Sequence, residues 1–333
     1  MIKLNFGEKY TIKVHLTSLI RSLREGMSMP RYGIIDLGSN TIRLCIYEIP
    51  APSKGSLQKK DIDTLLNYKI MAGLASHVHD SVMTKKGIKR AINTINAHLK
   101  RASHFNCKQV DVFATAVLRN CKNSAEATKA IEKGCNIKIN LLSSTDEAHL
   151  GFVGAQLDVP MQNGVIVDIG GGSTELSRIE NGKDSDSISI PQGSLSSYSL
   201  YTKGLLPTDE ELGVIAGHFL GLFEGKASAD YSTEQLYGIG GTIRSATKVW
   251  GDMFNEGERL NCLLPEHLDE ILTNYQKNPG LFAHKALQTI PDRIHTFIPG
   301  CIIVREIFKL SGAKQLTIAK FGVREGYLAE RIL

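Results

Sequence analysis

Three glycine-containing turns in this sequence combine residue types that are suited to binding phosphate. The most distinctive is Asp168-Ile-Gly-Gly-Gly-Ser-Thr-Glu175, which follows a run of β-branched residues. Successive glycines tolerate positive φ and leave backbone N–H groups uncovered, so such a loop can wrap around phosphate oxygens. A plain glycine-rich hairpin turn is the simpler alternative. The expected phosphate-binding residues of this loop are Gly170, Gly171, Gly172, Ser173 and Thr174.

Carboxylates flank this loop at both ends and favour the phosphate interpretation. Asp168, at the end of the expected strand, is suited to hold Mg²⁺ directly or through water, and Glu175 can support it. The spacing matches neither G-x-x-x-x-G-K-[ST] nor G-x-G-x-x-G, so it supports neither a P-loop nor a dinucleotide-binding fold.

Two further turns resemble the first. Asp36-Leu-Gly-Ser-Asn-Thr keeps the Asp and one Gly and then offers Ser39 and Asn40; alone, it would be explained as a capped hairpin turn. The turn Gly240-Gly241-Thr242 follows a short strand and opens a helix, whose first N–H groups attract anions. The likeness between the turns at Asp36 and Asp168 predicts two similar domains facing a shared cleft.

Two other residues have open interpretations. Ser144-Thr-Asp-Glu147 fits a capping box, and from spacing alone the cap is favoured over a catalytic carboxylate that activates water for attack on phosphorus. Arg119, which follows an expected strand, can bind a phosphate or pair with a surface acid.

Strands and helices alternate along the chain from residue 31, which predicts an α/β fold with a largely parallel or mixed sheet. Glycine and proline positions bound the expected elements. Strands are expected at 33–49 (two, joined by a tight turn), 110–117, 164–169 and 315–319, and helices at 88–102 and 124–132, from about 144, 208, 241, 265 and 299, and from 323.

Length and composition are those of an ordinary globular protein. The 333 residues suggest two domains, and 42% hydrophobic with 22% charged residues excludes a disordered or collagenous chain. The absence of a run of 18 apolar residues predicts no membrane span. The first 30 residues show no apolar stretch followed by a small-residue cleavage site, so secretion is not expected and a cytoplasmic location is. Basic runs with interleaved aromatic residues are missing, so nucleic-acid binding is not expected. Residues 1–30 form an expected N-terminal extension, with apolar residues at helical spacing over 16–23.

The motifs DLGSNTIRL, ATAVLRN, DIGGGSTE, GIGGT and GVREG occur in the order found in the exopolyphosphatase/guanosine pentaphosphate phosphohydrolase (Ppx/GppA) family. The chain resembles the short, two-domain form of this family over about residues 31–333. The resemblance implies two RNase H-like domains of the actin/Hsp70/sugar-kinase superfamily that flank a central cleft. The first would comprise 31–145 with a C-terminal helix at about 321–333, and the second 146–320.

The resemblance also implies roles for individual residues. Glu147 would be the general base, which reverses the preference for a cap. Asp168 and Glu175, together with Glu147, would hold Mg²⁺. The remaining candidates would grip phosphates: Ser39, Asn40, Arg119, the loop 170–174, and the turn Gly240, Gly241 and Thr242.

The function implied is a Mg²⁺-dependent phosphohydrolase that releases terminal orthophosphate from inorganic polyphosphate. Hydrolysis of guanosine pentaphosphate is the alternative, followed by a non-catalytic sensor of either ligand; a kinase ranks last. The resemblance also suggests a homodimer. Met71, His149 and His295 stand where the family has other residues, which bears on chain-length preference more than on fold.

Overall fold

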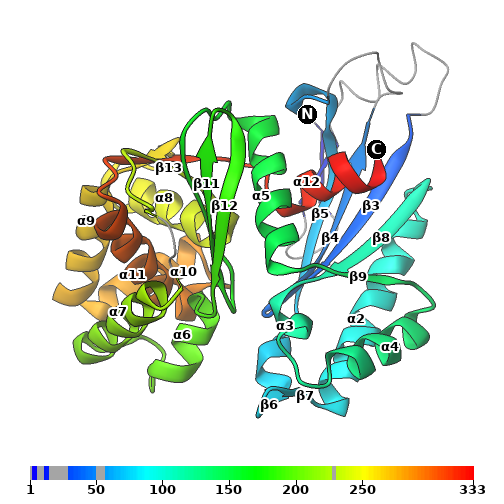
Figure 1. Cartoon of the computed structure of the whole chain (residues 1–333), viewed down its shortest axis with the longest axis horizontal. Helices are drawn as coiled ribbons and strands as arrows, with labels where there is room; N and C mark the ends of the chain where they lie inside the picture. Colours follow the sequence, from blue (N-terminus) through cyan, green and yellow to red (C-terminus); the bar gives the residue numbers. More distant parts are fainter. Residues whose placement is uncertain (1, 6–10, 15–28, 50–56, 227–229) are drawn as a thin grey trace. The chain divides into compact units, whose positions relative to one another are not determined.

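The chain forms two compact units, each described here by itself. The structure, a computed structural model, describes residues 2–5, 11–14, 29–49, 57–226 and 230–333 (Figure 1). The units comprise Met1–Ser143 with Arg331–Leu333, and Ser144–Glu330. The boundary is thus two residues before the expected one, and residues 321–330 belong to the second unit, although they were expected in the first.

The N-terminal extension contains a short antiparallel strand pair, β1 (Ile2–Asn5) with β2 (Thr11–Val14). The helix expected over 16–23 lies outside the described residues.

The first unit is built on a five-stranded mixed sheet of order β5-β4-β3-β8-β9. Strands β3, β4 and β5 are antiparallel, whereas β8 and β9 continue from β3 in parallel. Helix α2 packs against α4 and against β3 and β4. The bounds are β3 Arg31–Leu37, β4 Thr41–Glu48, β5 Asp63–Met71, β6 Val78–His79, β7 Val82–Met83, α2 Lys85–Ser103, β8 Gln109–Ala114, α3 Ala116–Arg119, α4 Ser124–Cys135 and β9 Ile139–Leu141.

The second unit has a six-stranded sheet of order β12-β11-β10-β13-β15-β14. Again the first three strands are antiparallel, and β13 and β15 run parallel to β10. The bounds are α5 Ser144–Asp158, β10 Gly164–Ile169, β11 Thr174–Glu180, β12 Lys183–Ile190, α6 Ser194–Tyr201, α7 Asp209–Glu224, β13 Gln235–Ile239, α8 Gly240–Phe254, β14 Cys262–Leu263, α9 Pro265–Lys277, α10 Pro279–Thr289, α11 Ile294–Ser311, β15 Gln315–Ile318 and α12 Val323–Tyr327.

Leaving β14 aside, the two sheets share one strand order and one set of directions, in keeping with the repeat in the sequence. Asp36 and Asp168 occupy matching positions, one residue before the end of the central strand. Each faces the adjacent parallel strand in the same register, Asp36 opposite Phe113 and Asp168 opposite Ile239. The predicted α/β class is therefore confirmed.

Strand β10 is apolar along its length because helices cover both faces of its sheet. Val165, Val167 and Ile169 enter one large core, together with residues of α7, α8, α9 and α11. Ile166 enters a smaller core on the other face, where α5 contributes Phe152 and Ala155. Because side chains alternate along a strand, Asp168 projects toward the face that α5 covers.

Three expected boundaries differ from the structure. The strand expected over 110–117 ends at Ala114, and α3 begins at Ala116. Helix α4 continues through Gly134 and ends where Asn136 adopts the left-handed conformation. Gly134 instead allows α4 to approach α2 closely, since a Cβ at Gly134 would lie 2.6 Å from Ile92 Cδ1. Helix α11 begins at Ile294, with Pro299 inside it.

Helices α5 and α12 touch through two glycines. A Cβ at Gly154 would collide with the backbone oxygen of Gly322, and one at Gly326 would collide with that of Leu150. Gly154→Ala should therefore lower the free energy of unfolding by about 3 kcal/mol or more, because backbone cannot yield as a side chain does. Chemical denaturation measures this. Gly213→Ala on exposed α7, with nothing within 4 Å of the added Cβ, should instead raise it by up to ~1 kcal/mol; equal effects would refute the packing argument.

No helix among the described residues is long and apolar enough to cross a membrane.

Candidate active site

The loop after β10 is held in shape by its carbonyl groups. The Gly170 N–H donates to the Ser173 oxygen at 2.9 Å, which closes the turn. The Gly170 and Gly171 oxygens accept from the N–H groups of Ser194 (3.0 Å) and Leu195 (2.9 Å), at the start of α6. Among the described residues, no backbone oxygen accepts from the N–H of Gly171 or Gly172. The loop can therefore offer N–H groups to an anion while its oxygens are occupied.

Close approach to α6 requires a further glycine. A Cβ at Gly193 would lie 2.6 Å from the Gly170 oxygen and 2.8 Å from the Gly171 carbonyl carbon. Thr174, fully buried at the start of β11, donates from its Oγ1 to the Gln192 oxygen at 2.7 Å. The Thr174 hydroxyl therefore stabilises the backbone beside the loop, which argues against the expected contact between Thr174 and phosphate.

Asp168 and Glu175 face each other across the β10–β11 hairpin. Directly opposite residues of an antiparallel pair project from the same face, so both carboxylates point toward the side covered by α5. Glu175 is 4% exposed, and Ser189 Oγ donates to its Oε1 at 2.9 Å.

The pKa of the Glu175 carboxyl is raised well above its usual value. Burial is the main cause, followed by the negative charges of Glu147 and Asp168. Hydrogen bonds from Ser173 and Ser189 partly offset the shift. The fold thus brings three carboxylates within electrostatic range, although they are separated by up to 28 residues of sequence.

Glu147 lies in the first turn of α5, which begins at Ser144. A capping box with Ser143 as the cap would use Asp146, the third helical residue, rather than Glu147. The charge of Glu147 acts on Glu175 instead. These observations favour a role for Glu147 beside the carboxylates.

The turn at Gly240 meets the same carboxylates. Gly240 has φ +86°, and a Cβ there would collide with Asp168 Oδ1. Thr242 Oγ1 donates to the Ile169 oxygen at 3.3 Å. The loop and the turn are therefore joined at the carboxyl ends of two adjacent parallel strands, the usual place for a ligand in such sheets.

Arg293, which was not predicted as a site residue, also lies here. A Cβ at Gly241 would collide with its guanidinium group. Burial lowers the pKa of Arg293, and the charge of Asp168 partly offsets this. Arg293 precedes α11 in a segment without a glycine motif, so no local pattern identifies it.

The first unit contains the other predicted residues. The Gly38 N–H donates to the Thr41 oxygen at 3.1 Å, as Gly170 does to Ser173. The oxygens of Ser39 and Asn40 accept from the N–H groups of Ala75 (2.9 Å) and Gly73 (2.8 Å). The turn at Ser39 and Asn40 thus repeats the geometry of the loop after β10.

The position of Arg119 is set by β8, the strand next to β3 and its turn. Arg119 ends α3, which follows β8, the parallel neighbour of β3, so it lies at the same sheet edge as Ser39 and Asn40. Its Nη1 donates to the Leu142 oxygen at 3.1 Å.

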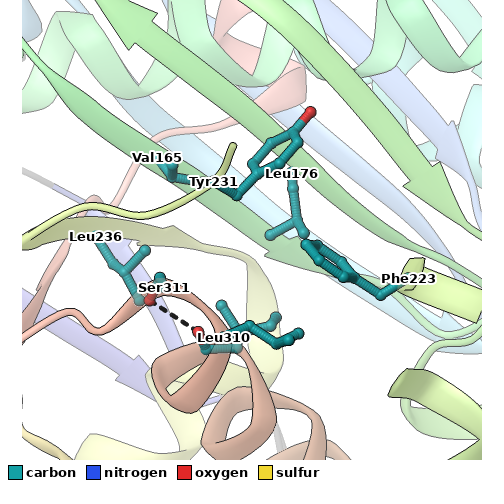
Figure 2. A pocket seen from close by; sticks show the side chains of 8 residues that line it. Val165, Leu176, Phe223, Tyr231, Leu236, Leu310 and Ser311 are labelled. Atoms are coloured by element: carbon teal, nitrogen blue, oxygen red, sulfur yellow. Dashed lines mark hydrogen bonds between the residues drawn. The ribbon is translucent and has the colours of Figure 1, made fainter. Parts of the chain in front are cut away.

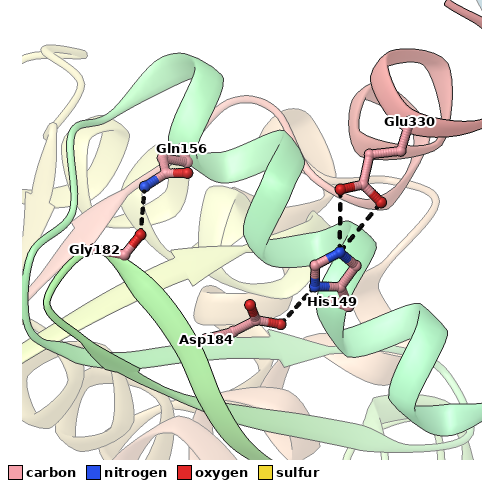
Figure 3. Close-up of polar contacts among 5 residues, drawn as sticks. All are labelled: His149, Gln156, Gly182, Asp184 and Glu330. Carbon is pink, nitrogen blue, oxygen red and sulfur yellow. Dashed lines mark hydrogen bonds and ion pairs between the residues drawn. The ribbon is translucent and has the colours of Figure 1, made fainter.

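His149 is held between two carboxylates of the second unit. Figure 3 shows Nδ1 on Asp184 Oδ2 (2.6 Å, β12) and Nε2 on Glu330 Oε1 (3.1 Å). Burial lowers the pKa of His149, but the hydrogen bond and charge of Asp184 and the charge of Glu330 outweigh it, so the pKa is raised. A titratable ion pair thus ties α5 to β12 and to the end of the chain.

This ion pair should make stability depend on pH. A raised folded-state pKa contributes stability that is fully present below the unfolded value of about 6.5 and is lost as pH rises through the folded value. Melting temperatures of the wild type and His149→Gln should differ most near pH 6 and converge at alkaline pH. A difference that does not change with pH would contradict the ion pair.

An interior cavity of the second unit is unsuited to a charged ligand. Figure 2 shows it lined mainly by apolar side chains, among them Leu176, Phe223 and Leu236. Its volume is about 10 Å³, room for at most about one water molecule. The half-buried loops at Asp168 and Gly240 therefore remain the better candidate site.

Comparisons with known proteins identify the family of the chain and its relatives. The profile described as the Ppx/GppA phosphatase family matches residues 61–333. Exopolyphosphatase 1 of Mycobacterium tuberculosis is 28% identical over 187 residues, which cover 54% of this chain and 50% of the relative, so the match spans half of that protein. A Haemophilus influenzae relative is 25% identical over 312 residues, 88% of this chain and 89% of its own.

Among solved structures, an exopolyphosphatase from Cytophaga hutchinsonii superposes with a TM-score of 0.75 at 19% identity, over 91% of this chain and 99% of that one. At this identity the likeness concerns the fold alone. It confirms the predicted RNase H-like type of fold.

Proposed function

The chain belongs to the Ppx/GppA phosphatase family, and from this premise we propose that it is a Mg²⁺-dependent phosphohydrolase that releases terminal orthophosphate from inorganic polyphosphate. The observation that carries the proposal is the convergence of Glu147, Asp168 and Glu175 beside a glycine loop with free N–H groups. Carboxylates and N–H donors together suit a metal-bound polyanion better than a neutral substrate.

The carboxylates fit a hydrated Mg²⁺ ion. Among the described residues, no group of three or more His, Cys, Asp or Glu side chains is arranged to hold a metal directly. Mg²⁺ is commonly bound through one or two carboxylates, with water and substrate phosphates completing the shell. Asp168 would hold it, and Glu175 lies opposite Asp168 on the neighbouring strand. When bound, Mg²⁺ would neutralise charge on the phosphate under attack.

The residues of the second unit can divide the reaction between them. Glu147 would take a proton from the attacking water, since it lies on the helix that covers the face toward which Asp168 and Glu175 point. The N–H groups of Gly171 and Gly172 would bind the terminal phosphate. Arg293, against Gly241, would stabilise the negative charge of the leaving phosphate.

The test is phosphate release by the purified protein with Mg²⁺ or with EDTA. Short polyphosphate, long polyphosphate, guanosine pentaphosphate and ATP are compared in parallel. Metal-dependent release from polyphosphate is expected. Release from the pentaphosphate alone would make the protein an alarmone hydrolase, and binding without release from any substrate would make it a sensor.

A further inference from the structure

One face of α8 carries a line of positive charge that begins at the candidate active site. Gly241, Arg244, Lys248 and Gly251 follow one another at intervals of three or four residues, so they lie along one side of the helix. We call this side, with the groups packed on it, the α8 stripe. The ten steps from Gly241 to Gly251 correspond to about 15 Å along the helix axis.

Each end of the α8 stripe receives an arginine from another segment. Arg293 lies against Gly241, because any side chain at 241 would collide with its guanidinium group. At the far end, the Gly257 N–H donates to the Gly251 oxygen at 2.9 Å, which folds the following loop back onto the helix. A Cβ at Gly251 would collide with the Glu258 oxygen and lie 3.8 Å from the Arg259 nitrogen. Two glycines thus let two arginine-bearing segments approach α8.

The charges of the α8 stripe repel one another. Burial lowers the pKa of half-buried Lys248, and the positive charges of Arg259, Arg244 and Arg293 lower it further, while Asp252 only partly offsets them. Within the described part of the chain, no carboxylate forms an ion pair with Lys248, Arg259 or Arg293. The mutual repulsion of the charges of Lys248, Arg259 and Arg293 destabilises the free protein and favours binding of an anion.

A solvated helix face or the helix dipole would explain this pattern less well. A solvated lysine would keep its charge in water and its ordinary pKa, whereas that of Lys248 is lowered. The dipole favours cations in the last turn of a helix, and the last turn of α8 contains no basic residue. Neither explanation accounts for the Arg293 guanidinium group against Gly241 or for the backbone of Glu258 and Arg259 against Gly251.

We propose that the α8 stripe binds the internal phosphates of a linear polyphosphate whose terminal phosphate lies at Asp168 and the glycine loop. This inference rests on the proposed function and deepens it. The order of the positions sets the path. Arg293 lies at the carboxylates and Lys248 lies about 10 Å along the helix. The backbone of Arg259 lies beside Gly251, three residues further along, and its charge acts on Lys248. A ligand with charge along such a length is a chain of phosphates. The α8 stripe therefore confers a preference for longer chains.

The experiment compares Lys248→Ala, Arg259→Ala and the double variant with the wild type. Lys285→Ala, which removes an exposed positive charge on α10, is the matched control. The double variant should raise KM for long-chain polyphosphate at least ~10-fold and for tripolyphosphate far less, so that the long-to-short preference collapses. Lys248→Arg, which keeps the positive charge, should retain much of the preference for long chains. Lys285→Ala should behave as the wild type.

A binding measurement separates this proposal from the proposed function. In EDTA, where turnover is not required, the affinity for long polyphosphate is measured over a range of salt concentrations. The slope of log Kd against log salt should fall by roughly 0.7 for each stripe cation removed. If the wild type binds long chains but hydrolyses none, only the proposed function fails. If the double variant binds long chains as the wild type does, or if Lys285→Ala loses as much, the α8 stripe has no such role.

Discussion

Glu147→Gln should lower kcat for polyphosphate by ~10²–10⁴-fold while the Kd for substrate stays within a few fold. Glutamine keeps the size of the side chain and can still accept a hydrogen bond, but it cannot take a proton from water. The substitution also removes one of the negative charges that raise the pKa of buried Glu175, so folding should not suffer. Single-turnover phosphate release and equilibrium binding together measure the two quantities.

The capping alternative predicts the opposite pattern. Glutamine serves at the third position of a capping box as glutamate does, so a purely capping Glu147 would tolerate the change with chemistry and stability intact. Unchanged turnover in Glu147→Gln would therefore return Glu147 to the capping role. Asp146→Asn is the matched control, because it removes a carboxylate from the same first turn of α5 and should leave turnover unchanged.

The sequence predicted the glycine turns well because their geometry is local. Three glycines after an apolar strand leave few conformations open, and the repeat of the Asp36 turn at Asp168 predicted a repeated fold. The shared strand order of the two sheets agrees with it. The end of the helix expected over 124–132 was wrong. A glycine near a helix end usually marks a C-cap, whereas α4 continues through Gly134, which makes room for the Ile92 side chain.

Residues placed by tertiary packing could not be predicted in this way. Arg293 reaches Gly241 because the segment before α11 packs on the start of α8, and Arg259 reaches the α8 stripe because a loop folds back on Gly251. Neither arginine belongs to a local motif. The helical spacing of Arg244 and Lys248 is visible in the sequence, but that spacing alone is equally typical of a solvated helix face.

Gly240→Ala should lower kcat/KM at least ~100-fold, although the site of substitution carries no reactive group. The added Cβ would collide with Asp168 Oδ1, so the carboxylate must leave its position between Glu175 and the turn. The left-handed φ of +86° adds strain of about 1–3 kcal/mol for any residue with a Cβ. Both the displacement of Asp168 and the backbone strain would disturb the contact between the loop after β10 and the start of α8.

Misfolding has to be separated from displacement of Asp168. Circular dichroism and the melting temperature show whether the variant folds, and kcat/KM is compared only for folded protein over a range of Mg²⁺ concentrations. If Asp168 holds the ion, the variant should need more Mg²⁺ for half-maximal rate. Gly213→Ala, also in a helix of the second unit but with open space around its Cβ, should retain wild-type kcat/KM. A folded Gly240→Ala enzyme with wild-type kcat/KM and Mg²⁺ dependence would show that Asp168 does not hold the metal from this position.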